Sequence, residues 1–370
     1  MKRRLLIFSA AYQPFVGGAE VAVKEITDRL TDYDFDLITV NLDQKQPAEE
    51  EIGSVSIYRL TGSKYFFPLA AYRLAAKLHQ EKKYDAVWAI MANQAGMAAA
   101  LFKRRFSSVP FLLTLQEGDN LNSLAYRLRL LAPRWFGVFR RADYLTAISN
   151  YLARWARQMG AQCPMTVIPN GVDLNNFQLL GSSFQDKKRN EKTIITTSRL
   201  VWKNGVDILI EAMQFLPSNA RLQILGTGPE DRNLKLKAKS YHLEARVEFL
   251  GHVPPNEIPN YLAQADVFAR PSRSEGLGNS FLEAMAVGVP VIGTPVGGIP
   301  DFLKDGETGW FCKVNNPKSV AEKVKYILDP NNREKVEQVI TNAKKLVMEK
   351  YEWIKISQRM AQIIAKLTEI

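Results

Sequence analysis

Apolar residues form short runs separated by amphipathic stretches through the first half of the chain. Apolar positions at helical spacing predict a helix over residues 21–30. The runs that we expect to form buried strands are residues 5–9, 35–40, 55–60, 86–90, 111–115 and 144–148. Buried strands that alternate with helices in this way are typical of a parallel, doubly wound sheet, in which ligands bind beyond the carboxyl ends of the strands.

The same alternation begins again in the second half. A helix is predicted over residues 206–215, and the buried runs are residues 193–198, 221–225, 247–250, 267–268 and 289–292. A chain of 370 residues exceeds the size at which one core stops growing, so two domains are expected. The polar, charged run over residues 181–192 indicates a linker. We therefore predict an α/β protein with Rossmann-like doubly wound domains over residues 1–173 and 193–350, joined by a linker over residues 174–192.

Charge and composition narrow the choice of partners. The net charge of +11 predicts attraction to an anion such as a nucleotide, a phospholipid surface or a nucleic acid. No helix-turn-helix, zinc-finger or RNP-type signature accompanies the charge, so we expect no nucleic acid. Cys163 and Cys312 form no CxxC pair, which fits a reducing cytoplasm. Only His79, His242 and His252 are present, without a histidine–carboxylate cluster, so no metal site is expected.

The start of the chain is similar to a signal peptide, but we expect it to be the first buried strand. Its apolar run covers only residues 5–11 and is followed by Gln13-Pro14 instead of a cleavage site. The sequence contains no run of 18 apolar residues, so we expect no membrane-spanning helix. These features predict a cytoplasmic protein.

A basic, aromatic segment lies between residues 120 and 142 and contains no carboxylate. Its arginines are Arg127, Arg129, Arg134, Arg140 and Arg141. They alternate with apolar side chains, so the segment can lie on an anionic lipid surface as a peripheral contact. The alternative is a surface helix that buries its leucines in the core and leaves its arginines in solvent.

The stretch EGLGNSFLEAMA, residues 275–286, carries the strongest pattern for a ligand site. Gly276 and Gly278 allow a turn that other residues disfavour, and Asn279 or Ser280 is expected to cap the helix that follows. The amide groups and positive dipole end of such a helix suit a phosphate. Glu275 and Glu283 would then border the anion and bind sugar hydroxyls on either side of a diphosphate. The alternative is a capping box, in which Glu283 pairs with Ser280 at the helix start.

Three other loops follow predicted strands. Gly17 and Gly18 directly precede the first helix, where they either present amides to an anion or form a tight packing turn. Arg199 and Lys203 follow the first strand of the second domain, where they either meet the same diphosphate or are surface charges. The Gly226-Thr227-Gly228 turn lacks the third glycine of a dinucleotide fingerprint, and no Walker loop is present, so neither of those sites is expected.

Taken together, these patterns make the chain resemble the retaining glycosyltransferases of family 4, the group 1 type, with the GT-B fold. The resemblance rests on PFVGGAE, AIS at residues 147–149, IPNGVD, SRLVWKNGVDILIEA, LGTGPE, FLGHV, EGLGNSFLEAMA and PVGGIPDFLKDGETGWF. It implies two Rossmann-like domains facing across a cleft, with the last helix, over residues 351–370, packing back on the first domain. An apolar stripe at helical spacing supports this helix: Ile356, Met360, Ile363, Ile364 and Leu367.

The resemblance also implies a site for a nucleotide-sugar donor, a UDP- or GDP-sugar, with no other cofactor. Arg199 and Lys203 would neutralise the diphosphate, Glu275 would contact the sugar, and Glu283 would bind the ribose. Of these, Glu275, Arg199 and Lys203 are the expected catalytic residues. The remaining donor-binding residues implied by the family motifs are Gly17, Gly18, Asn204, Gly228, Val253, Gly276, Leu277, Gly278 and Asn279.

The chain departs from the family pattern at two positions. The family usually has lysine directly before the glycine that matches Gly205, whereas this chain has Asn204 there and the lysine one residue earlier. Family members also often carry a histidine in a Thr-x-His setting near the sugar, where this chain has Gln116. A glutamine is no base, so a mechanism that needs histidine there is excluded. Gln116, Glu117 and Asp119 are expected near the sugar or the acceptor.

The expected activity is metal-independent, retaining transfer of a hexosyl-type sugar to a hydroxyl of a glycan or lipid-linked acceptor. The basic segment favours assembly of cell-surface polysaccharide or glycolipid at the inner membrane face. The alternatives are a nucleotide-sugar epimerase, which needs acid and base side chains near the sugar, and a non-catalytic nucleotide-sugar-binding subunit.

Overall fold

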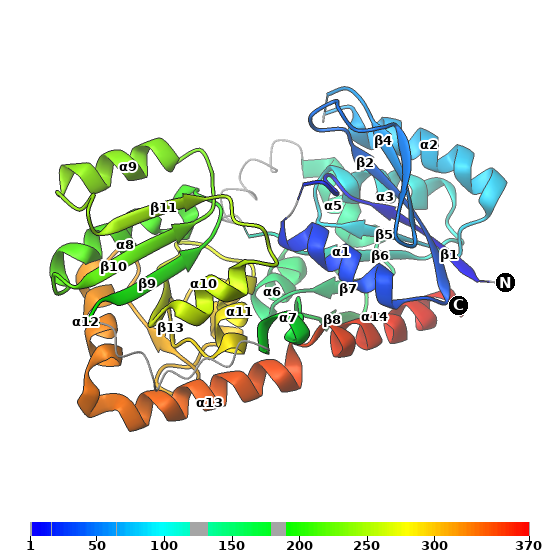
Figure 1. Ribbon diagram of the computed structural model, residues 1–370. Helices are drawn as coiled ribbons and strands as arrows, with labels where there is room; N and C mark the ends of the chain where they lie inside the picture. Colours follow the sequence, from blue (N-terminus) through cyan, green and yellow to red (C-terminus); the bar gives the residue numbers. More distant parts are fainter. Residues whose placement is uncertain (1, 16, 64, 119–131, 179–189, 370) are drawn as a thin grey trace. The chain divides into compact units, whose positions relative to one another are not determined.

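The computed structural model describes residues 2–15, 17–63, 65–118, 132–178 and 190–369. The chain divides into two compact units (Figure 1). The N-terminal unit comprises Met1–Asn170 together with Trp353–Ile370, and the C-terminal unit comprises Gly171–Glu352. Among the described residues, no helix combines the length and the apolar character that crossing a bilayer requires.

The N-terminal unit is built on an eight-stranded sheet in the order β3-β4-β2-β1-β5-β6-β7-β8. All neighbouring strands pair in parallel except β3 and β4. The strands are β1 (Arg3–Phe8), β2 (Tyr33–Val40), β3 (Glu49–Ile52), β4 (Val55–Leu60), β5 (Ala86–Ile90), β6 (Phe111–Leu115), β7 (Tyr144–Ala147) and β8 (Met165–Val167). The predicted doubly wound α/β architecture is confirmed in this unit.

Helices cover both faces of this sheet (Figure 1). They are α1 (Gly18–Arg29), α2 (Phe67–Lys82), α3 (Gln94–Arg105), α5 (Ala132–Arg141), α6 (Asn150–Gln158) and α14 (Trp353–Thr368). Leu5 and Ile7 are buried in one cluster with side chains of α1 and α14. Phe8 instead packs on Phe102 of α3, with ring centroids 6.4 Å apart. Because successive strand residues point to opposite faces, α1 and α14 cover one face and α3 covers the other.

The C-terminal unit contains a six-stranded parallel sheet in the order β11-β10-β9-β12-β13-β14. Its strands are β9 (Lys192–Thr197), β10 (Ala220–Leu225), β11 (Val247–Gly251), β12 (Val267–Arg270), β13 (Val291–Gly293) and β14 (Trp310–Phe311). Its α-helices are α7 (Leu174–Gln178), α8 (Val206–Ala212), α9 (Asp231–Ser240), α10 (Ile258–Gln264), α11 (Asn279–Val287), α12 (Pro317–Leu328) and α13 (Arg333–Lys350). A short 3₁₀ turn, η1 (Trp202–Asn204), precedes α8.

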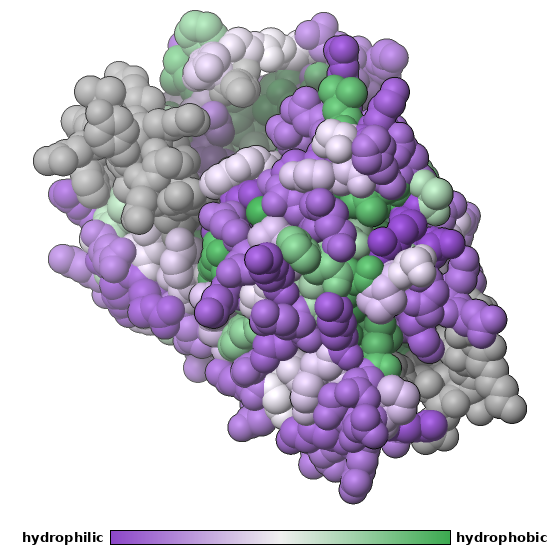
Figure 2. Space-filling model, turned by 90° about the vertical axis from the view of Figure 1, so that its left-hand side faces the viewer, coloured by the Kyte–Doolittle hydropathy of each residue, from purple (hydrophilic) through white to green (hydrophobic). Residues whose placement is uncertain are grey.

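The helices of this unit also divide between the two faces of the sheet. Val267 and Ala269 of β12 are buried with residues of α8, α9 and α12. Phe268 between them packs on Phe281 of α11, with ring centroids 5.1 Å apart. Helix α11 therefore lies on the face opposite to α8. The face that Figure 2 shows is mainly hydrophilic, with apolar side chains gathered in small areas.

The junctions between the units differ in detail from the predicted boundaries. The first junction falls between Asn170 and Gly171, and the second between Glu352 and Trp353. Residues 174–178 of the predicted linker fold as α7, which packs on α11 in the C-terminal unit, and Lys192 already belongs to β9. Residues 179–189 lie outside the described residues.

Candidate functional site

The loops that follow the strands of the C-terminal unit lie against one another at the carboxyl edge of its sheet. The Leu200 amide donates to the Thr227 carbonyl at 2.9 Å, which joins the loops after β9 and β10. The Gly298 amide donates to the Glu275 carbonyl at 3.2 Å, which joins the loops after β13 and β12. These contacts bring together loops from four strands at the edge where doubly wound sheets bind their ligands.

Helix α11 begins from a glycine in the left-handed region. Its N-cap is Gly278, with φ of 101°, and no side chain caps the helix. A Cβ at Gly278 would lie 2.8 Å from Phe281 Cδ2 and 2.9 Å from Arg270 Nη2. The predicted cap by Asn279 or Ser280 is therefore wrong. The capping-box alternative also fails, because Ser280 lies inside the helix and its Oγ accepts a hydrogen bond from Arg270 Nη1 at 2.7 Å.

Glu275 lies in the loop just before this helix and is held at both carboxylate oxygens. Oε2 accepts from Arg270 Nη2 at 2.5 Å, and Oε1 accepts from the Gly276 amide at 3.0 Å. The side chain remains 14% exposed. Because a carboxylate offers about four acceptor positions, each oxygen retains capacity for a hydroxyl donor from a ligand.

Glu283 is the fifth residue of α11, so it lies one turn beyond the helix start. Its carboxyl group has no hydrogen-bond partner among the described residues. The protein packed around it raises its pKa to about 7, and the positive charge of Arg270 opposes that rise. A partly exposed carboxyl with unused acceptors is suited to hydroxyl groups of a ligand.

The loop after β9 presents the predicted cations. The Arg199 side chain is exposed and pairs with none of the described residues. Lys203 is partly exposed on the η1 turn. Asn204 is buried, and its Nδ2 donates to the Arg199 carbonyl at 2.7 Å. Asn204 therefore shapes the loop that carries Arg199, and its amide group does not project as the lysine of the family pattern would.

Arg273 fixes the η1 turn and was not identified from the sequence. Its guanidinium forms two hydrogen bonds to Asp207, at 2.8 and 2.7 Å, and lies 4.6 Å from the Trp202 ring. Its backbone amide donates to the Lys203 carbonyl at 2.6 Å. Burial tends to raise the pKa of Asp207, but the hydrogen bonds and charge of Arg273, with Lys237, lower it overall. This carboxylate therefore stays ionised and the turn stays anchored.

Two further predicted residues lie on neighbouring loops. A Cβ at Gly228 would come 2.2 Å from the Leu200 carbonyl oxygen, so the turn after β10 packs directly on the turn after β9. Val253 follows β11 and is partly exposed. Both residues lie on the same edge of the sheet as Arg199 and Glu275.

In the N-terminal unit, the glycine pair lies at the start of α1. Gly17 is the N-cap and Gly18 is the first helical residue. Burial raises the pKa of Glu20, while hydrogen bonds from the backbone amides of Gly17 and Glu20 to its carboxyl group oppose that rise. The helix start is thus already occupied by a carboxylate of its own chain, which an incoming phosphate would have to displace.

Gln116 and Glu117 are buried at the end of β6, where both serve the framework of the N-terminal unit. Gln116 Oε1 accepts from Asn170 Nδ2 at 3.0 Å, and the same nitrogen lies 3.4 Å from the Gly18 carbonyl. Glu117 Oε1 accepts from the Ala92 amide at 2.6 Å. Asn170, in the IPNGVD motif, therefore links the Gln116 loop to the glycine pair, a role that the sequence did not indicate. Asp119 lies outside the described residues.

Most of the basic, aromatic segment also lies outside the described residues. Its last part forms α5, in which Val138 and Phe139 are buried and Arg140 and Arg141 are exposed. The Phe139 ring meets the Trp155 ring edge-on at 5.3 Å. This described end has the pattern of a helix that packs on the core.

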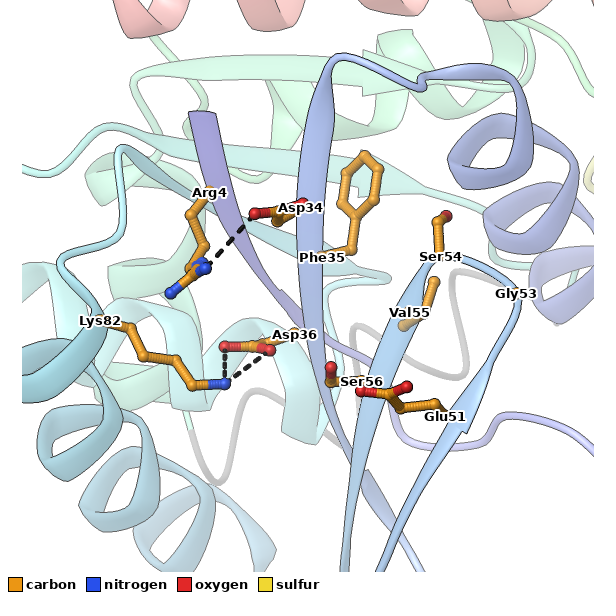
Figure 3. Close-up of a pocket in the computed structure, with 10 residues that line it drawn as sticks. All are labelled: Arg4, Asp34, Phe35, Asp36, Glu51, Gly53, Ser54, Val55, Ser56 and Lys82. Atoms are coloured by element: carbon orange, nitrogen blue, oxygen red, sulfur yellow. Dashed lines mark hydrogen bonds and ion pairs between the residues drawn. The ribbon is translucent and has the colours of Figure 1, made fainter. Parts of the chain in front are cut away.

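The N-terminal sheet has a hollow of about 220 Å³ at its amino edge, where its parallel strands begin (Figure 3). Four of the charged residues that line it form two ion pairs. Arg4 pairs with Asp34 at 3.3 Å, and Lys82 pairs with Asp36 at 2.8 Å. Because these charges are paired and the hollow lies away from the carboxyl ends of the strands, we assign the functional site to the loops of the C-terminal unit.

Comparisons with known proteins identify the family of the chain. The family model for glycosyl transferases group 1 matches residues 182–346, and that for Glycosyltransferase Family 4 matches residues 16–176. An uncharacterized glycosyltransferase of Methanocaldococcus jannaschii, MJ1178, is 26% identical, with 98% of this chain and 99% of that protein covered. A GDP-mannose-dependent alpha-(1-6)-phosphatidylinositol monomannoside mannosyltransferase of Mycobacterium tuberculosis is also 26% identical, with 89% and 90% covered.

Solved structures share the fold over nearly the whole chain. Sucrose-phosphate synthase from Thermosynechococcus elongatus superposes with a TM-score of 0.86 at 20% identity, with 99% of each chain covered. Anabaena Alr3699/HepE in complex with UDP and glucose superposes with a TM-score of 0.82 at 21% identity, with 98% of this chain and 100% of that chain covered. The two family models together span both units, and the chain therefore belongs to the group 1 glycosyltransferases and has the GT-B fold.

Proposed function

We propose that this protein is a retaining hexosyltransferase that moves a sugar from a UDP- or GDP-sugar to a hydroxyl group of an acceptor. The proposal rests on the groups that lie together at the carboxyl edge of the C-terminal sheet. There, the exposed Arg199 and the first turn of α11 share an edge with two carboxyl groups that retain acceptor capacity. A diphosphate at the helix start, with hydroxyl groups on either side, matches this arrangement of charge.

The proposed mechanism follows from the charge that develops on the donor during the reaction. As the bond between sugar and diphosphate breaks, negative charge builds on the leaving phosphate. Arg199, Lys203 and the amides at the start of α11 would stabilise that charge, and oriented groups of this kind contribute several kcal/mol. We therefore propose that the reaction needs no metal ion, because side chains supply the positive charge.

Retention of configuration needs no strong protein base in this scheme. The departing phosphate oxygen can take the proton of the acceptor hydroxyl on the same face of the sugar. The carboxamide of Gln116, in the position where the family often has histidine, is compatible with this route. Glu275 would orient the sugar hydroxyls and would not act as a nucleophile.

The names of two relatives support a glycan or lipid-linked acceptor in polysaccharide or glycolipid assembly. One is the phosphatidylinositol monomannoside mannosyltransferase described above. The other is a putative colanic acid biosynthesis glycosyltransferase of Escherichia coli, 31% identical with 62% of this chain and 58% of that protein covered. With the net charge of +11, we propose that the acceptor is reached at an anionic membrane surface.

The test is incubation of the intact protein with a panel of UDP- and GDP-sugars, followed by separation of the products. A transferase should slowly release a nucleoside diphosphate from one donor, faster with an acceptor. An isomeric nucleotide sugar would instead identify an epimerase. Tight binding without any product would identify a non-catalytic nucleotide-sugar-binding subunit.

A further inference from the structure

The C-terminal unit buries a charged residue that the mechanism above does not use. Arg270 ends β12 and is only 6% exposed. Removing a guanidinium from water costs several kcal/mol unless its partners compensate. The preceding strand residues are apolar, and a buried apolar side chain would satisfy the same position at no such cost.

Arg270 contacts three parts of the segment that forms the candidate site. Its Nη2 donates to Glu275 in the loop, and its Nη1 donates to Ser280 in the first turn of α11. Its Cζ lies 4.8 Å from the ring centroid of Phe281, a position that favours cation–π attraction. The absence of a side chain at Gly278 leaves the space that Nη2 occupies. One guanidinium therefore ties the loop to the helix.

The position is unfavourable for a cation without nearby carboxyl groups, and here Glu275 and Glu283 supply them. Arg270 lies beside the start of α11, where the helix dipole disfavours a cation. Glu275 is its one ion-pair partner among the described residues. What the pair provides is a carboxylate held at a fixed place and orientation, since Oε2 is bound to Arg270 and Oε1 to the Gly276 amide.

We propose that Arg270 is a positioning residue that aligns the Glu275 carboxylate with the hydroxyl groups of the donor sugar. The inference rests on the proposed function, because it assigns to Arg270 the recognition of the sugar part of that donor. It predicts that different residues of the site bind different parts of the donor. Arg199 and Lys203 bind the diphosphate, whereas the Arg270–Glu275 pair distinguishes a nucleotide sugar from the bare nucleoside diphosphate.

The experiment compares two ligands on a set of variants of the full chain. Each variant is titrated with the nucleoside diphosphate and with the nucleotide sugar selected by the donor panel, and sugar transfer is measured in parallel. Arg270→Met should lose much less affinity for the nucleoside diphosphate than it loses turnover, because Arg270 touches the diphosphate side of the site only through Ser280 and its charge near Glu283. It should lose about 10- to 100-fold in turnover of the nucleotide sugar, the scale of one charged hydrogen bond.

Two further variants separate positioning from general stability. Arg270→Lys keeps the positive charge and donates from a single nitrogen, so it should recover part of the activity. Glu275→Gln should reproduce the loss, and the double variant Arg270→Met with Glu275→Gln should be little worse than either alone, because both changes remove the same interaction.

The matched control is Arg246→Met. It makes the same change at an arginine that directly precedes β11, at the amino edge of the same sheet. Arg246 donates to the backbone carbonyls of Pro217 at 2.8 Å and Ala220 at 3.1 Å. Its loss should lower the melting temperature without changing the ratio of the two affinities.

Four results would overturn the inference. Equal losses for nucleoside diphosphate and nucleotide sugar in Arg270→Met would show that Arg270 serves the diphosphate or the fold. Additive effects in the double variant would show that Arg270 and Glu275 act independently. A wild-type protein that binds no nucleotide sugar would remove the proposed function itself and this inference with it, whereas wild-type turnover in Arg270→Met would remove the inference alone.

Discussion

Glu283 combines two properties that rarely occur together without a function. Its carboxyl group is enclosed enough for its pKa to rise to about 7, and none of the described residues hydrogen bonds to it. An acceptor that is largely enclosed by protein and has no partner there loses part of its hydration, and a ligand hydroxyl would restore a hydrogen bond. At the scale of single residues, this side chain is therefore the clearest candidate for a ribose contact.

Replacement of Glu283 with alanine should weaken the binding of nucleoside diphosphate about tenfold or more, because a hydrogen bond to a charged group is lost. The fold should remain intact, since the side chain forms no hydrogen bond with the described residues. Calorimetric titration with UDP and GDP measures the first effect and circular dichroism the second. Unchanged affinity would remove Glu283 from the site.

The pKa of Glu283 also predicts how stability depends on pH. Its folded-state pKa, about 7, is above the ordinary value of 4.5, so ionisation of this group destabilises the folded protein. Relative to Glu283→Gln, the wild type should lose free energy of unfolding as pH rises from about 4.5 to about 7, and the difference should then stay constant. Denaturant titrations of both proteins across this range measure it. A difference that does not vary with pH would contradict the raised pKa.

Several residues of the site could be found from the sequence, and others could not. Glu275, Glu283 and Arg199 stand in motifs beside glycines and strand ends, so their types and spacing indicate chemistry. Arg270 escaped detection because an arginine at the end of an apolar run is ordinarily a surface charge. Its partners Glu275 and Ser280 follow it by five and ten residues, and only the fold brings all three together.

At the scale of elements, the start of α11 determines the site. The helix is capped by a glycine with φ of 101°, and its first turn is bound to Arg270 through Ser280. Backbone geometry therefore sets where the helix amides lie, without a capping side chain that would compete with a phosphate for them. The wrong prediction of a cap at Asn279 or Ser280 came from residue preference, which the packing of Phe281 and Arg270 around Gly278 overrides.

Replacement of Gly278 with alanine should lower the free energy of unfolding by about 1–3 kcal/mol, because alanine disfavours this φ value. The new Cβ would also press on Phe281 and Arg270, so donor binding should fall as well. The matched control is Gly306→Ala, at a similarly left-handed φ of 70° but with no atom within 4 Å of the added Cβ. Equal losses in the two variants would mean that the contacts around Gly278 contribute nothing.

The strands show which elements the pattern of apolar residues can predict. Every predicted run of the N-terminal half overlaps an observed strand, because the buried side chains of these strands are apolar and can be recognised in the sequence. Strand β3 was missed because it begins Glu49-Glu50-Glu51 and pairs only at the sheet edge, and β14 because it has two residues. Such strands form because they pair with a neighbouring strand. The pattern of residues within the strand itself carries no information about that pairing.

At the scale of the whole molecule, the chain builds two sheets, one parallel and one parallel except for β3, and its last helix returns to the first unit. Burial of the apolar stripe of α14 with β1 and α1 accounts for this return. From periodicity alone the stripe predicted only a helix, and its destination followed from the family resemblance. The division of the chain into two units followed from its length and from the repeat of the strand and helix pattern.

The proposed mechanism predicts that removal of divalent metal ions leaves the reaction unaffected. In that mechanism, Arg199, Lys203 and the start of α11 would supply the positive charge that a metal ion would otherwise provide. Sugar transfer measured after dialysis against EDTA should match that of the untreated protein within about twofold. Loss of activity that is restored by magnesium or manganese would show that these groups are insufficient.

The most direct test of the central claim is a crystal structure of the protein with its nucleoside diphosphate. The account predicts density for the diphosphate at the amino end of α11, in contact with Arg199, with the ribose hydroxyls on Glu283. A nucleotide bound elsewhere, for example in the hollow between Arg4 and Lys82, or an Arg199 side chain turned away from the phosphates, would contradict it.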